Sequence, residues 1–130
     1  MEAVAEQLKT VAPNRLVTRD LTEFMNRETT ERQQGVFTVL MGTEGDYPNY
    51  VGREGQLGTV SLSIIGQIEI PEPSTGLMVE DAEHVMVKEL KNLAQSDLPE
   101  PIGGLLLQRV RHSMQIDRPY GWVVSEWLIE

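Results

Sequence analysis

Two histidines, His84 and His112, are the side chains best suited to acid–base or metal chemistry, because imidazole titrates near neutral pH and binds metal ions. His84 follows Glu83 in a segment with helical periodicity, and His112 shares the alternating parity of Val110. Neither belongs to a His-Glu-x-x-His pattern, in which two histidines one helical turn apart bind zinc. Isolated histidines are more often partly buried structural residues. We therefore expect no metal site and no catalytic role for either.

Other motifs that carry chemistry are missing from the sequence. There is no Gly-x-Ser-x-Gly elbow, no glycine-rich phosphate loop followed by lysine, and no cysteine. The segment 43–46 (TEGD) has two carboxylates but lacks the ligand ladder of a calcium loop, which favours a solvated loop over a weak divalent-cation contact. The sequence leaves open a pair of catalytic carboxylates that distant positions bring together. We expect no cofactor and no enzymatic activity.

Length and charge narrow the class of protein further. A chain of 130 residues fits one domain, and its formal charge of −9 disfavours nucleic acids and anionic membranes as partners. No window approaches the roughly 18 consecutive apolar residues of a membrane-spanning helix. The first residues, MEAVAE, have neither the basic nor the apolar region of a signal peptide, so we expect none. We expect a cytoplasmic or assembled-particle location.

The first half of the chain is predicted to contain a helix, short strands and loops. Val4, Leu8 and Val11 are spaced as one side of a helix that Pro13 and Asn14 end. Four segments follow: a short strand at 15–20, a turn or mobile loop at 21–34 with a short helix as the alternative, a strand at 36–41, and a glycine-rich loop at 42–58.

The second half gives clearer patterns. Residues 59–70 alternate between apolar and polar side chains, which predicts a strand with one buried face, and Gly66 suggests a bulge. Residues 77–95 carry an apolar stripe at helical spacing (Val79, Ala82, Met86, Leu90, Leu93), and Ser74 or Thr75 can cap this helix. A hairpin is expected next, formed by strands at 105–117 and 122–129 around a turn at 118–121.

The predicted fold class follows from this order of elements. We expect a single α+β domain over residues 1–130, with two main helices packed on a mostly antiparallel mixed β-sheet.

Five residues are candidates for a protein–protein interface, because Tyr, Trp and Arg are enriched in such contacts. They are Tyr47, Tyr50 and Arg53 in the 42–58 loop, and Trp122 and Trp127 in the last strand. The two tryptophans are five residues apart and therefore point to opposite faces of the strand. One can fill the core, and the other needs cover from a helix or from a neighbouring subunit. Two core tryptophans in a doubly covered sheet are an equally good reading.

The layout resembles the tail terminator family of long-tailed phages, the group of the lambda minor tail protein U. The resemblance rests on four features: the length, an N-terminal helix leading to an early strand and a long loop, a long alternating strand (59–70) followed by an amphipathic helix (77–95), and a C-terminal strand pair ending in Glu126-Trp127-Leu128-Ile129. It covers nearly the whole chain and is a likeness of layout, without a sharp motif. The polar stretch 21–34 is longer than expected for a compact member.

The resemblance implies a structural virion protein with no catalytic residues. It implies a homo-oligomeric ring, usually a hexamer, that forms on the end of the tail tube, stops tube polymerisation and presents the surface for head joining. Before they meet the tube, such proteins are monomers or weak oligomers. The implied partners are further copies of the chain, the tail tube protein and a head-completion protein. The implied location is the tail of the virion, and the host cytoplasm during assembly.

Three alternatives differ in role or class. One is a head–tail connector or another tail-completion protein of similar fold. Another is a small bacterial ligand- or partner-binding α+β domain, which predicts a deep and mostly apolar pocket. An enzyme is the weakest alternative, given the absence of motifs.

Overall fold

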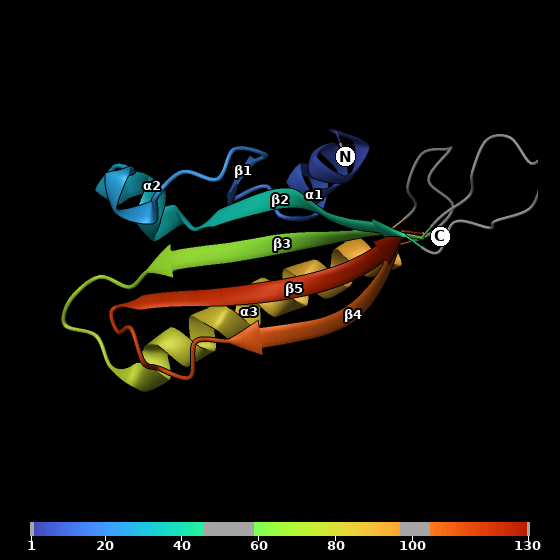
Figure 1. The fold of residues 1–130 in the computed structure, drawn as a ribbon. Helices are drawn as coiled ribbons and strands as arrows, with labels where there is room; N and C mark the ends of the chain where they lie inside the picture. Colours follow the sequence, from blue (N-terminus) through green and yellow to red (C-terminus); the bar gives the residue numbers. More distant parts are fainter. Residues whose placement is uncertain (1, 46–58, 97–104, 130) are drawn as a thin grey trace, which may run out of the picture.

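The computed structural model describes residues 2–45, 59–96 and 105–129 (Figure 1). Most of the predicted 42–58 loop therefore lies outside the described residues. So do the candidate interface residues Tyr47, Tyr50 and Arg53, whose role stays a prediction.

The described residues form one five-stranded sheet in the order β1-β2-β3-β5-β4. The strands are β1 (Leu16–Thr18), β2 (Val36–Gly45), β3 (Thr59–Glu69), β4 (Leu105–His112) and β5 (Tyr120–Ile129). Only β1 and β2 pair in parallel, while the other three pairs are antiparallel. The predicted mostly antiparallel mixed sheet is therefore confirmed.

Helices α1 (Glu2–Val11) and α3 (Gly76–Gln95) pack on the same face of this sheet (Figure 1). Leu8 of α1 and Leu90 of α3 share one apolar core with Phe37, Ile64 and other inward-facing strand residues. Burial of these side chains stabilises the fold by roughly 1.5–3 kcal/mol each. The predicted single α+β domain with two main helices is thus confirmed.

Helix α3 follows its sequence pattern closely. The hydroxyl of Thr75 accepts a hydrogen bond from the Met78 N–H at 3.2 Å, which confirms one of the two predicted caps. Of the predicted stripe, Ala82 is half-buried and the other four residues are buried. A carboxylate, Glu83, is buried with them at 1% exposure.

The segment 21–34 was expected to be a turn or mobile loop, with a short helix as the alternative, and the helical alternative is confirmed. It forms a 3-10 turn, η1 (Phe24–Asn26), and the short helix α2 (Thr29–Gln34). Tertiary contacts hold it: Arg32 binds Glu69 of β3 at 2.9 Å, and Phe24 packs edge-on against Tyr120 with ring centroids 6.1 Å apart. The segment covers one end of the sheet face opposite α1 and α3.

Four predicted details were wrong. Strand β2 runs to Gly45 instead of residue 41, with a register irregularity after Met41. Strand β4 ends at His112 instead of residue 117, because Met114 and Gln115 have left-handed φ values of 59° and 64° that cannot continue a strand. Strand β5 begins at residue 120 instead of 122, so the connection is 113–119 and not the predicted turn at 118–121. Gly66 keeps a regular register with both neighbouring strands, so it is not a bulge.

Gly66 is required for close packing instead. A Cβ atom there would lie 2.9 Å from Met86 Cε and from Val123 Cγ2, both of which belong to buried core residues. The glycine lets α3 approach the centre of the sheet.

Candidate functional site

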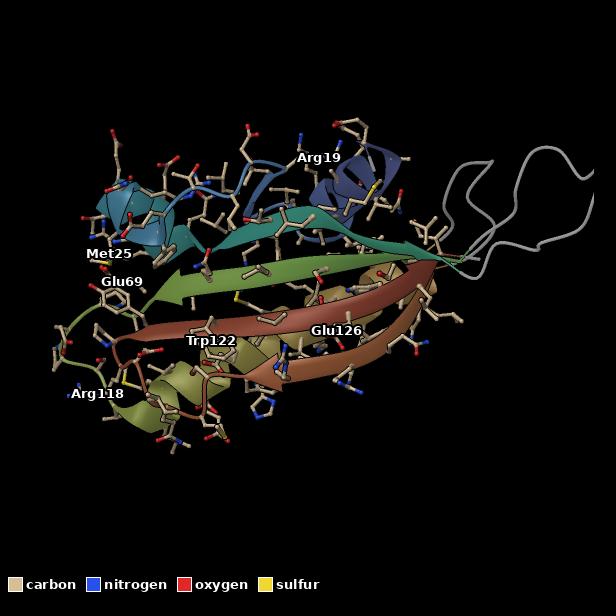
Figure 2. The ribbon with its side chains drawn as sticks, in the orientation of Figure 1. Arg19, Met25, Glu69, Arg118, Trp122 and Glu126 are labelled. Atoms are coloured by element: carbon tan, nitrogen blue, oxygen red, sulfur yellow. The ribbon has the colours of Figure 1, made fainter. Side chains whose placement is uncertain are left out.

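The two tryptophans of β5 lie on opposite faces of the sheet, as their spacing predicted. Trp127 is fully buried, and its indole N–H donates to Ser125 Oγ at 2.7 Å. Trp122 is half-buried on the other face, where its indole N–H donates to Asp117 Oδ2 at 3.0 Å (Figure 2). Trp127 therefore belongs to the core, and only Trp122 offers its side chain to a partner.

The face that carries Trp122 is covered only in part. Within the described ranges, the η1–α2 segment shields the end of this face at Glu69 and Tyr120, and no helix lies over the rest (Figure 1). We call this area the open face. Its apolar side chains are partly or fully exposed: Ile65, Leu106, Trp122, Val124 and Leu128. An uncovered apolar surface of this kind is typical of a protein–protein contact.

The β4 edge and the segment after β1 differ in charge. Edge strand β4 carries Arg109 and Arg111, both exposed, and has no acidic residue. The segment 20–31 follows β1 and reaches Tyr120 at the end of the open face. It has four acidic residues and one arginine, a net charge of −3. Oppositely charged surfaces on one molecule are complementary to each other in a neighbouring copy.

A groove of about 620 Å³ lies at one end of the open face. Phe24 and Met25 of η1 form one wall, Ile116 and Arg118 of the β4–β5 connection form another, and Trp122 lies between them. Figure 2 shows Met25, Arg118 and Trp122 at this end of the molecule. Met25 and Ile116 are 51% and 71% exposed, so the groove is apolar and open to solvent.

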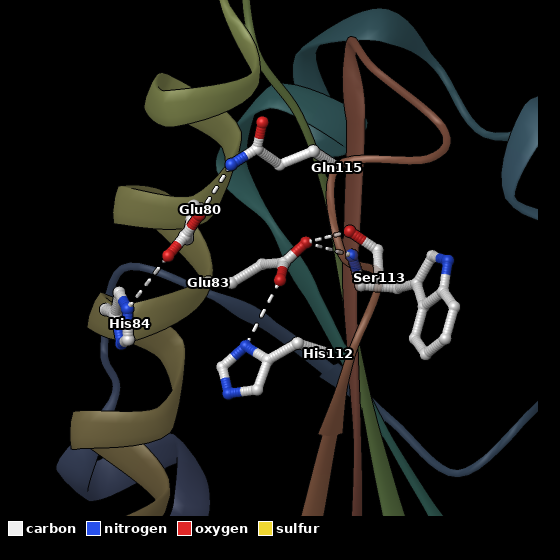
Figure 3. A network of polar contacts seen from close by, with 7 residues as sticks. Glu80, Glu83, His84, His112, Ser113 and Gln115 are labelled. Carbon is white, nitrogen blue, oxygen red and sulfur yellow. Dashed lines mark hydrogen bonds and ion pairs between the residues drawn. The ribbon is translucent and has the colours of Figure 1, made fainter.

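A second candidate site is built around the buried carboxylate of Glu83 (Figure 3). The Ser113 hydroxyl donates a short hydrogen bond to Glu83 Oε2, and the Trp122 backbone N–H donates to the same oxygen at 3.2 Å. His112 Nδ1 lies 3.2 Å from Glu83 Oε1. Three groups from β4, β5 and their connection therefore satisfy a carboxylate that would otherwise be costly to bury.

This arrangement differs from a nucleophilic triad. In a triad the histidine lies between the nucleophile and the acid, whereas here Glu83 lies between Ser113 and His112. Ser113 is also fully buried, so a substrate cannot reach its hydroxyl. Glu83 therefore has a structural role, because its hydrogen bonds link α3 to β4 and β5.

The solvent side of this network is a pocket of about 340 Å³ beside His84 and His112. The two imidazole rings lie 5.6 Å apart between centroids. Helical periodicity contained a signal for this site, since position 83 falls within the buried stripe between Val79 and Met86. A carboxylate at such a position requires partners from another element. The sequence analysis treated the two histidines separately and gave no role to Glu83 or to the arginines of β4.

No protein-family model matches the sequence, and a search of curated proteins finds no match. None of the helices in the described ranges has the length and hydrophobicity needed to cross a membrane.

Proposed function

We propose that the chain is a structural subunit of a phage tail, of the tail terminator type. Copies would form a closed ring on the end of the tail tube, stop tube polymerisation and present a surface for head joining. The virion tail would be its final location. The observation that carries the proposal is an uncovered apolar sheet face bordered by the basic β4 edge and by the acidic segment 20–31.

Two oppositely charged surfaces suit a ring because ring contacts are heterologous, so that two different surfaces meet. In the proposed ring, the β4 edge with Arg109 and Arg111 lies against the acidic 20–31 segment of the next copy. The open face, including Trp122 and Val124, then contributes apolar contact area beside this charged contact. The net charge of −9 opposes association at low ionic strength, and salt relieves that repulsion.

The layout of the elements supports the same proposal. An N-terminal helix, a long alternating strand, an amphipathic helix and a C-terminal strand pair occur in the order of the tail terminator resemblance. A head–tail connector or tail-completion role fits that layout equally, and it predicts the same self-association with a different neighbour.

The apolar groove favours a second candidate function, a small ligand- or partner-binding domain. Its volume of about 620 Å³ and its aromatic and methionine lining lie within the range of ligand sites. This reading predicts a monomer that binds an apolar ligand or peptide through Met25 and Trp122.

Sedimentation velocity over a range of protein and salt concentrations, with negative-stain electron microscopy, tests the ring. We expect the parent chain to form a closed ring of about six copies. The double variant Arg109→Glu/Arg111→Glu should stay monomeric, because both contacting surfaces would be acidic. Lys88→Glu/Lys91→Glu is the matched control, with the same charge change on exposed positions of α3, and should assemble like the parent.

A second variant, with reversed charge in the segment 20–31, tests the same contact from the other side. The variant Asp20→Arg/Glu23→Arg should also be monomeric alone, because its two contacting surfaces are both basic. Mixed with the β4 double variant, it should form rings of alternating copies, since every contact then joins unlike charges. A parent that stays monomeric in every condition, or a β4 double variant that associates like the parent, would contradict the proposed ring.

A further inference from the structure

We propose that the pocket between α3 and the end of β4 binds one divalent transition-metal ion of the zinc type. The ligands are His84, His112 and Glu80. This inference concerns a single chain and does not rest on the proposed ring.

The two histidines are close enough to share an ion. Zinc–nitrogen bonds are about 2.0–2.1 Å long and tetrahedral, which places two coordinated imidazole centroids about 5 Å apart. The observed separation is 5.6 Å, with the rings tilted by 51°. The observed separation is therefore close to that of two imidazoles on one ion. Both rings are accessible, since the side chains of His84 and His112 are 64% and 32% exposed.

Glu80 supplies an oxygen on the same side. It lies one helical turn before His84, and its Oε1 is 3.8 Å from His84 Nε2. That distance is too long for a hydrogen bond. It is close to the roughly 3.3–3.5 Å between two donors on one tetrahedral ion. The other carboxylate oxygen accepts a hydrogen bond from Gln115 Nε2 at 2.6 Å, which orients the group.

Glu83 prepares His112 to act as a ligand. Its carboxylate already accepts hydrogen bonds from Ser113 and Trp122, so His112 Nδ1 is the donor in the 3.2 Å contact with Glu83 Oε1 (Figure 3). The proton on Nδ1 leaves the lone pair on Nε2, which is the tautomer a metal ion needs. A carboxylate behind a coordinating histidine is the usual arrangement in zinc sites. Glu83 is a positioning residue here, not a ligand.

The ligand types favour transition-metal ions over Mg²⁺ and Ca²⁺. Imidazole nitrogen suits Zn²⁺, Co²⁺, Ni²⁺ and Cu²⁺, whereas Mg²⁺ and Ca²⁺ prefer all-oxygen sites. In the described part of the chain, no three His, Asp or Glu side chains already stand in position around an ion. The proposed site is therefore one that the ion completes by drawing His84 and Glu80 toward His112, with water in the fourth position.

Calorimetric titration of the untagged full chain with Zn²⁺ tests the site. We expect one saturable site per chain, unaffected by excess Mg²⁺, and a tetrahedral Co²⁺ absorption spectrum. His84→Asn should remove saturable binding. Glu80→Gln should weaken binding about tenfold or more, whereas Asp81→Asn, the same change on the adjacent exposed residue, should not. Glu83→Gln should weaken affinity by about 10–100-fold through His112.

Several results would overturn the proposal. They are an absence of Zn²⁺ binding by the folded parent chain, equal binding by the parent and His84→Asn, and a ratio of one ion per two chains. His84 is exposed on α3, so its substitution should leave the fold intact, and circular dichroism checks this. Titration at concentrations where sedimentation shows a monomer separates the metal site from ring formation, because either can then fail alone.

Discussion

The two faces of the sheet are built from the same strands, yet they have different surroundings. Along β5, Val123, Ser125 and Trp127 are buried beneath α3 and its neighbours, while Trp122 and Val124 are only half-buried on the open face. Both faces of this strand are largely apolar. Apolar character alone therefore does not distinguish a core face from a contact face; the placement of the helices does.

The burial and hydrogen bonding of polar groups also differ between the two faces. On the covered face, the Glu83 carboxylate is buried and receives hydrogen bonds from two sequence regions. On the open face, Glu126 is 41% exposed and lies 3.7 Å from Arg109, a pairing that water screens. We expect the first arrangement to contribute strongly to stability and the second to contribute little.

The largest contrast is expected between the tryptophans. Trp127→Ala should lower the free energy of unfolding by about 3–5 kcal/mol, because it leaves a large cavity in the core. Trp122→Ala should lower it by about 1 kcal/mol or less, because that side chain is half-exposed. Urea denaturation followed by circular dichroism measures both. Equal losses would show that the open face is as important to folding as the covered face.

A smaller effect is expected at the buried carboxylate. Glu83→Ala should cost about 3 kcal/mol, since it leaves the Ser113 hydroxyl and the Trp122 N–H without their acceptor. Glu80→Ala, one turn earlier and partly exposed, is the matched control and should cost under about 1 kcal/mol. The same urea titrations apply. A Glu83→Ala chain as stable as the control would mean that the network adds nothing to stability.

The mildest test uses adjacent valines of β5. Val123→Thr places a hydroxyl in the core and should cost about 1–3 kcal/mol. Val124→Thr makes the same change on the open face, and its effect on unfolding should stay within about 0.5 kcal/mol. Thermal unfolding of the pair reports the difference. If the order were reversed, the assignment of the two faces would be wrong.

Local sequence patterns predicted most of the elements. The alternation at 59–70 and the stripe at 77–95 correspond to β3 and α3, and Thr75 caps that helix. These features depend on periodicity and on neighbours within one turn, which the sequence contains directly. The segment 21–34 was predicted less well, because its helical turns are held by Glu69 and Tyr120 from distant strands.

The sequence by itself determined that β5 has two apolar faces and that its tryptophans oppose each other. Only the tertiary structure decided that Trp127 is the core residue, because that choice depends on which face α1 and α3 cover. It likewise brought His112 to Glu83 across 29 residues and placed it beside His84. Such contacts depend on sheet register and helix placement, which no local pattern specifies.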